Sequence, residues 1–259
     1  MKKNKYKILV LSDLKNSPSA VLKSAISLAN MIHGSIEFYH VKKPTDVVEN
    51  ENQLSAMRKI NEDYNVTEKR IRELIIPLSK DYGVNINYKF SIGNIKSEIS
   101  KQIEMMKPDI IVLGKRKSKT FNLIGDSITN FVLKKHKGGI MIAAAKNALE
   151  PNVEISLGVL NGVEGLQNMD FAEDIIGYTQ KPLKSFKIVN NSNTAESLGN
   201  PSNMKTVEYV FEQGDNVIKN LSNYLAKSNI NLFCLDRGKK NANEALINKL
   251  NVSLLVTND

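Results

Sequence analysis

Short apolar runs alternate along this chain with longer stretches in which apolar residues recur every three or four positions. Residues Tyr6–Ser12 are typical of a buried strand, because Ile8 to Leu11 are consecutive and apolar. Pro18 near the start of the next periodic stretch and the pair His33-Gly34 at its end predict a helix between them. The same reasoning predicts strands over 36–41, 84–90, 109–113 and 140–145, and helices over 53–82, 95–106 and 126–136.

The pattern restarts after residues 146–152, which have the polar, Pro-containing character of a linker. Strands are predicted over 155–160, 183–189 and 252–256, with a helix over 166–178. Residues 190–203, rich in Asn and Ser, are predicted to be a surface loop in place of the long helix of the first half.

Two segments of the first half recur in the second. Residues 90–93 (FSIG) match 211–214 (FEQG), and 108–117 match 231–240. Strands that alternate with helices form parallel sheets through right-handed crossovers. The sequence therefore predicts an α/β fold of two tandem, open, twisted, mainly parallel five-stranded sheets, with domains 1–147 and 148–259 and a shortened second copy. Because apolar edge strands need covering, we expect the two fifth strands to meet inside a pseudo-dimer of the two halves.

Charge is unevenly distributed between these halves. Residues 1–147 carry 26 basic and 14 acidic residues, a net charge of +12, and residues 148–259 have a net charge of −3. The lysines are scattered, aromatic residues are few and no nucleic-acid motif is present, so a general Lys bias is favoured over specific nucleic-acid binding. No stretch has the length and apolarity of a membrane span, and Ile8–Leu11 is too short for a signal-peptide core.

Candidate catalytic and metal-binding residues are few. A single cysteine, Cys234, excludes an internal disulfide and a cysteine-based metal site, which favours a cytoplasmic protein. His33, His40 and His136 follow no metal-ligand spacing, and Ser12-Asp13 lies in no nucleophile-elbow pattern. We therefore expect neither a metal site nor a catalytic set, although slow nucleotide hydrolysis with Asp13 as base stays open as a weaker hypothesis.

The strand over 109–113 leads to the strongest candidate site. It meets Gly114, continues into a basic loop that contains Lys115, Lys117 and Lys119, and enters a helix near Gly125-Asp126-Ser127. Unpaired backbone N–H groups at such a helix start favour anions. The other interpretation, a solvated basic loop, is the more common one for such a run.

These residues and the strand order resemble the universal stress protein family over the whole chain, as two tandem domains. The resemblance implies ATP or another adenine nucleotide as ligand, bound by a loop of spaced glycines that ends in Ser or Thr. It places Asp13 and Val41 beside the nucleoside. The phosphate loop and helix start then correspond to a larger set: Gly114, Lys117, Gly125, Asp126, Ser127 and Ile128.

The loop departs from the family pattern in two places. Lys117 replaces a glycine, and either alignment of Gly125 and Asp126 leaves a carboxylate at the helix start, where it caps the N–H groups that a phosphate needs. In the second half, Asn161 is taken to replace Asp13 and Asp236 the strand-four glycine, so no nucleotide is expected there. The favoured hypothesis is a non-enzymatic stress-response or regulatory protein with weak or lost nucleotide binding, and the alternative is an ATP-binding regulator that uses the first domain.

Overall fold

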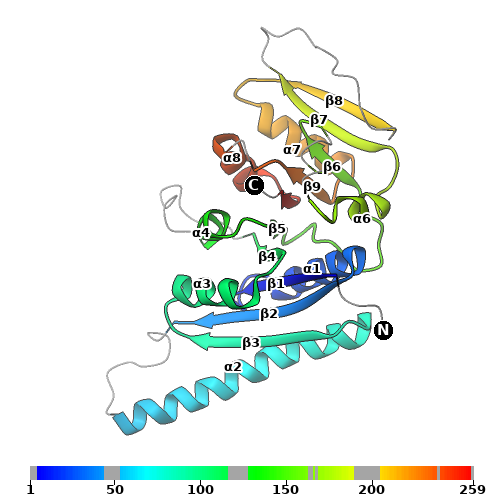
Figure 1. Ribbon diagram of the computed structural model, residues 1–259. Helices are drawn as coiled ribbons and strands as arrows, with labels where there is room; N and C mark the ends of the chain where they lie inside the picture. Colours follow the sequence, from blue (N-terminus) through cyan, green and yellow to red (C-terminus); the bar gives the residue numbers. More distant parts are fainter. Residues whose placement is uncertain are drawn as a thin grey trace.

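The computed structural model describes residues 5–43, 53–115, 128–162, 166, 169–189, 205–237 and 240–257. Their strands form one ten-stranded sheet in the order β3-β2-β1-β4-β5-β10-β9-β6-β7-β8, which runs through the whole molecule (Figure 1). The strands are β1 (Tyr6–Ser12), β2 (Gly34–Lys42), β3 (Ile86–Ile92), β4 (Ile110–Gly114), β5 (Gly139–Ala143), β6 (Leu157–Leu160), β7 (Leu183–Val189), β8 (Thr206–Glu212), β9 (Leu232–Leu235) and β10 (Ser253–Val256).

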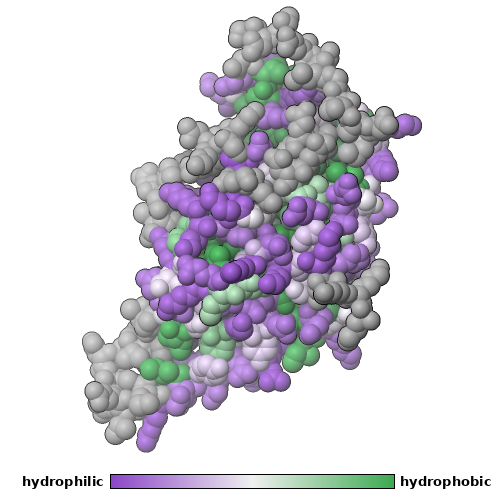
Figure 2. Space-filling view, in the orientation of Figure 1, coloured by the Kyte–Doolittle hydropathy of each residue, from purple (hydrophilic) through white to green (hydrophobic). Residues whose placement is uncertain are grey.

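Helices cover both faces of this sheet. They are α1 (Pro18–Ile32), α2 (Gln53–Tyr82), α3 (Ile95–Met106), α4 (Ile128–Lys135), α6 (Ala172–Gly177), α7 (Val217–Lys227) and α8 (Lys240–Lys249). One hydrophobic core joins α1, α2 and α6 to one face, and a second joins α3, α4, α7 and α8 to the other. On the side of the molecule shown in Figure 2, the described surface is mostly hydrophilic, with apolar side chains in small groups.

The α/β fold with a mainly parallel sheet is confirmed, with one change in how the two sheets relate. Neighbouring strands within each half are parallel, whereas β5 pairs with β10 in antiparallel register, with Met141 opposite Leu255 at the centre of three pairs. The predicted meeting of the two fifth strands is therefore observed, and their hydrogen bonds join the two expected sheets into one. This pairing removes both exposed strand edges. With helices on the two faces, both strands are buried along their whole length.

The predicted end of the first helix at His33-Gly34 is confirmed, because α1 ends at Ile32 and His33 takes the left-handed conformation after it (φ 54°). Gly34 begins β2 at a place where a Cβ would lie 2.7 Å from Ile8 Cδ1. Two other segments differ from the prediction in detail. Residues 146–152 connect β5 to β6, as predicted for a linker, but they are packed against the first half: Leu149 is 1% exposed and its N–H donates to Ser24 Oγ on α1 (3.0 Å). Of the helix predicted over 166–178, the structure describes the shorter α6. The predicted loop over 190–203 lies outside the described residues.

The register defines which residues of the two halves correspond. A rotation that exchanges Met141 with Leu255 also exchanges Val112 with Cys234, and therefore Gly114 with Asp236. The predicted match of Gly114 to Asp236 agrees with this register. The gapless match of residues 108–117 to 231–240 is wrong by one residue, because it pairs Gly114 with Arg237. The match of Phe90 to Phe211 also fails, because these rings belong to the cores on opposite faces of the sheet. The match of Asp13 to Asn161 is wrong by one residue, because Val10 corresponds to Val159 and Asp13 therefore to Gly162.

Candidate functional site

The carboxyl ends of β1, β2 and β4 meet at one edge of the sheet, as expected for parallel strands that ligands approach from that side. A cavity of about 70 Å³ lies there. Four residues proposed from the sequence line it together, namely Asp13, Val41, Gly114 and Ile128. The other four, Lys117, Gly125, Asp126 and Ser127, lie outside the described residues.

Asp13 is held in a fixed orientation by the loop that connects β1 to α1. Its Oδ1 accepts hydrogen bonds from the backbone N–H groups of Lys15 (2.9 Å) and Asn16 (3.0 Å), and its Oδ2 accepts from Asn16 Nδ2 (2.7 Å). This is the local turn that a short acidic side chain forms with the backbone after it. Asp13 therefore orders the loop and does not cap α1, which begins only at Pro18. It also lines the wall of the cavity.

The loop after Asp13 has a strained backbone. Leu14 and Ser17 both have left-handed φ angles, 57° and 48°, and Ser17 makes no side-chain cap to α1. Arg70 on α2 donates from Nη2 to the Leu14 carbonyl oxygen (3.3 Å). Tertiary contacts thus hold this loop, because local preference alone disfavours left-handed leucine.

His40 on β2 binds the carboxyl end of the neighbouring strand β1. Its Nδ1 donates to the carbonyl oxygen of Ser12 (2.8 Å), and burial lowers the pKa of its imidazole because the charged form loses hydration. The ring is therefore neutral at pH 7 and fixes the end of β1 on β2. This agrees with the structural role expected of a single histidine at the end of a strand.

Gly114 serves close packing as well as the cavity wall. A Cβ on Gly114 would lie 2.7 Å from Val21 Cγ2 on α1, nearer than side-chain carbon atoms approach. Val21 itself is 4% exposed and borders the same cavity. The glycine thus lets α1 lie directly against the end of β4.

The structure adds cavity residues that the sequence reasoning missed. Tyr39, Asn16 and Thr129 line the space, and Ile95 and Ile99 of α3 close it. Tyr39 could have been found from Val41, because residues two apart on a strand share one face. Its hydroxyl donates to Ser91 Oγ (2.8 Å), which positions the ring between β2 and β3.

The basic run after β4 is divided by the fold. Lys115 turns its side chain away from the cavity, and its Nζ donates to the carbonyl oxygen of Leu250 at the end of α8. Burial lowers the pKa of this ammonium to about 8. Lys115 is therefore not a phosphate-attracting charge, which corrects its grouping with the basic loop, and Arg116 to Lys119 lie outside the described residues.

The corresponding strand ends of the second half carry different chemistry. Gly162 (φ 99°) stands at the position of Asp13 and Asp236 at that of Gly114. The carboxylate has thus moved from the first strand to the fourth, next to where a phosphate loop would begin. Its charge disfavours an anion at that place.

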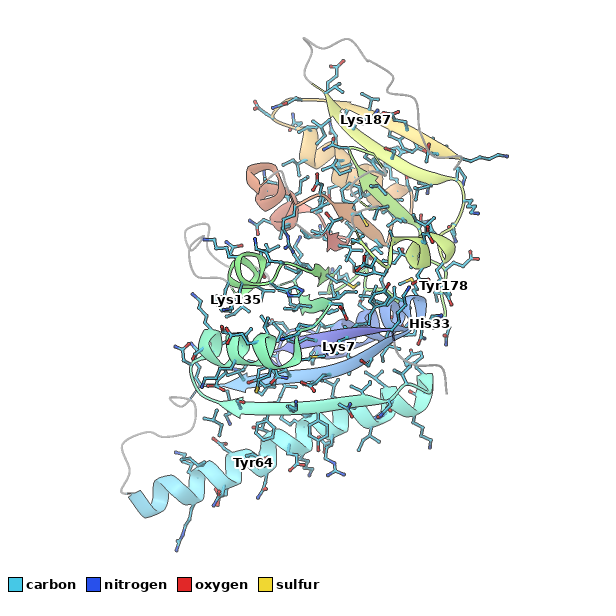
Figure 3. All side chains as sticks on the ribbon, viewed as in Figure 1. Lys7, His33, Tyr64, Lys135, Tyr178 and Lys187 are labelled. Atoms are coloured by element: carbon cyan, nitrogen blue, oxygen red, sulfur yellow. The ribbon has the colours of Figure 1, made fainter. Side chains whose placement is uncertain are left out.

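A larger cavity of about 620 Å³ follows β3 between α2 and α3. Tyr64 of α2 lies beside this strand (Figure 3) and its ring packs on that of Phe90, with centroids 4.4 Å apart. The lysines of the cavity are paired, Lys89 with Glu37 (3.1 Å) and Lys101 with Glu98 (2.7 Å). Because these charges compensate one another, the cavity has no evident preference for a charged ligand.

Comparison with known proteins agrees with this architecture. The model of the universal stress protein family matches residues 6–143, which is more than half of the chain. The chain belongs to the universal stress protein family. No curated protein matches the sequence.

Solved structures extend the likeness beyond the matched residues of this universal stress protein. One from Archaeoglobus fulgidus DSM 4304 covers 98% of this chain and 96% of its own, with 15% identity and a TM-score of 0.65. A putative universal stress protein from Pseudomonas aeruginosa UCBPP-PA14 covers 97% of this chain and 92% of its own, with 11% identity and a TM-score of 0.56. At these identities the likeness establishes the fold, including that of the second half.

Proposed function

We propose that this universal stress protein is a non-enzymatic regulator that binds an adenine nucleotide weakly, at one site per chain. The observation that carries the proposal is the cavity at the ends of β1, β2 and β4, with Asp13, Val41 and Gly114 on its wall. In open α/β sheets, ligands bind beyond these strand ends. A carboxylate held as Asp13 is held suits the hydroxyl donors of a ribose.

Weak binding follows from the size of the cavity and from the adjoining sequence. About 70 Å³ is far less than the roughly 300–1,000 Å³ of ordinary small-molecule sites, so a nucleotide must displace side chains to enter. The carboxylate of Asp126 also opposes phosphate at the predicted helix start. The net charge of +12 over residues 1–147 compensates in part, because it attracts anions at long range.

A regulatory rather than catalytic role is supported by the groups around the cavity. Among the described residues that line it, Asp13 is the one carboxylate, and Ser12 Oγ accepts from the Leu14 N–H while His40 is committed to the Ser12 carbonyl oxygen. No described pair therefore has the nucleophile–base arrangement of a hydrolase. We assign the second half, over residues 148–259, a structural role without nucleotide.

A cytoplasmic location forms part of the proposal. Cys234 is fully buried and burial raises the pKa of its thiol, so this cysteine is a packing residue compatible with a reducing compartment. Among the described helices, none is both long and apolar enough to cross a bilayer.

Calorimetry with ATP, ADP and AMP tests the proposal. We expect a stoichiometry of one and a dissociation constant weaker than about 10 μM, equivalent to less than about 7 kcal/mol. Asp13→Ala should weaken binding further, whereas Asn161→Gly, directly after β6 and beside Gly162, the residue that corresponds to Asp13, should not. Glycine is chosen there because Asn161 has a φ of 61°, which glycine adopts without strain.

Micromolar or tighter ATP binding would favour the alternative, an ATP-binding regulator with a functional loop. A stoichiometry of two, or equal effects of the two variants, would show that the second half also binds. Absence of binding at millimolar ATP would refute the nucleotide part of the proposal.

A further inference from the structure

In addition to the β5–β10 pairing, two basic side chains, one from each half, reach across to the other half. Lys115, directly after β4, donates from Nζ to the carbonyl oxygen of Leu250, the residue after α8. Arg237, two residues after β9, donates from Nη1 to the carbonyl oxygen of His136 (2.9 Å), the residue after α4, and from Nη2 to that of Gly138 (2.7 Å). Each cation therefore caps a helix of the opposite half.

The two contacts are equivalent by the pseudo-symmetry of the sheet. The register that exchanges Met141 with Leu255 exchanges Lys115 with Arg237, and His136 with Leu250. The acceptor residues have the same helical hydrogen bond, since the His136 and Leu250 N–H groups each donate to the carbonyl oxygen four residues earlier, both at 2.9 Å. Cations at helix C-termini are favourable, because the last carbonyl groups carry partial negative charge.

One of the two contacts adjoins the candidate site and the other does not. Lys115 is bonded to Gly114 in the chain, and Gly114 forms part of the cavity wall with Ile128 and Thr129. The Lys115 N–H also donates to the Ala143 carbonyl oxygen (2.9 Å), so backbone and side chain together fix this residue. Arg237 follows Asp236, where the second half has lost the glycine.

The contact of Lys115 has an electrostatic cost. Its ammonium is half-buried, and α8 offers it a carbonyl oxygen in place of a full hydration shell. A methionine at this position would fill similar space without that cost, so packing alone does not explain a lysine there. The directional bond to Leu250 is what lysine adds.

We infer that Lys115 is a positioning residue through which the second half of the chain supports the nucleotide cavity of the first. By holding Lys115 on α8, the contact fixes the backbone that leaves Gly114 and thereby the wall of the cavity. The second half is then part of the site without touching the ligand. This inference rests on the proposed function for its ligand, but the effect of the Lys115–Leu250 hydrogen bond on the backbone can be measured without ligand.

The test compares three variants of the full-length protein. Lys115→Met removes the bond and keeps most of the volume, Lys115→Arg keeps a donor, and Arg237→Met breaks the matching contact away from the cavity. Two quantities are measured: the dissociation constant for ATP, and the hydrogen-exchange rate of amides 110–115. Thermal unfolding of each variant checks that it is folded at the assay temperature.

We expect Lys115→Met to weaken ATP binding and to speed exchange at 110–115 by about three- to tenfold each, the scale of one lost hydrogen bond. Lys115→Arg should keep ATP affinity and the exchange rate at 110–115 close to their natural values. Arg237→Met should lower thermal stability without changing either quantity. Equal effects of the methionine variants on ATP binding, or unchanged exchange at 110–115 in Lys115→Met, would overturn the inference. If the natural protein binds no ATP, the proposed function fails, and the exchange rates alone decide whether Lys115 holds this segment.

Discussion

Substitution of Gly114 tests whether this glycine is required by packing or by a ligand. In Gly114→Ala, the new methyl group would lie 2.7 Å from Val21 Cγ2, about 1 Å closer than carbon atoms pack without repulsion. Val21 is buried but borders the cavity, so the overlap is relieved by shifting α1 or the end of β4, or by turning the Val21 side chain into the cavity. We expect a destabilisation of about 1–3 kcal/mol, the usual cost of one added methyl group in a packed core.

A double-mutant cycle with Val21→Ala isolates that overlap. Val21→Ala alone should cost about 2 kcal/mol, from two buried methyl groups at about 0.8 kcal/mol each and a small cavity. The alanine at 114 then occupies the vacated space, so the double variant should be no less stable than Val21→Ala. The expected coupling is therefore at least about 1 kcal/mol in favour of the pair.

Urea denaturation followed by circular dichroism measures these free energies of unfolding. Calorimetry of the double variant with ATP measures whether binding also requires glycine at position 114. Restored stability with lost ATP binding would show that a ligand also needs the bare backbone of Gly114, whereas restored binding would make the glycine purely a packing residue. A Gly114→Ala variant as stable as the natural protein, or strictly additive single substitutions, would refute the packing argument.

Three further predictions concern Lys115, Asp126 and Leu149. The pKa of Lys115 is about 8, below the ordinary 10.5, so between these pH values the unfolded state holds a proton that the folded state has released. The free energy of unfolding should therefore rise with pH from about 8 to 10.5, and urea titrations of Lys115→Met should show less of this rise. Asp126→Gly should tighten ATP binding about tenfold, or about 1.4 kcal/mol, and slightly lower the melting temperature; unchanged calorimetric affinity would contradict the role given to this carboxylate. Leu149→Ala should destabilise the protein by about 2–5 kcal/mol in urea denaturation, because Leu149 is 1% exposed. A loss of stability under about 0.5 kcal/mol would show that the 146–152 segment is not tightly packed on the first half.

The pattern of apolar positions predicted the elements of the first half in their order, but it gave no bounds for β8, α7 and α8 of the second half. The predicted bounds of β1, α2, α3 and β7 agree with the structure, because apolar periodicity and local end signals lie within each segment. The repeated pattern also predicted that the two fifth strands meet, because pairing with each other covers two apolar strands that would otherwise be exposed at sheet edges. Asp13, Val41 and Gly114 were placed on one side of the sheet because parallel strands end there. Ile128 was added by the family resemblance, and all four residues line one cavity.

Contacts between residues far apart in the chain could be found only from the folded arrangement. The contact between Lys115 and Leu250 spans 135 residues and reverses the role that a basic run suggested for this lysine. The need for glycine at 114 comes from Val21 on a helix nearly a hundred residues earlier, and the one-residue error at Asn161 comes from a strand register set by β9. Local preferences act over a few residues, whereas the direction of a side chain and the register of paired strands are fixed by the packing of the whole sheet.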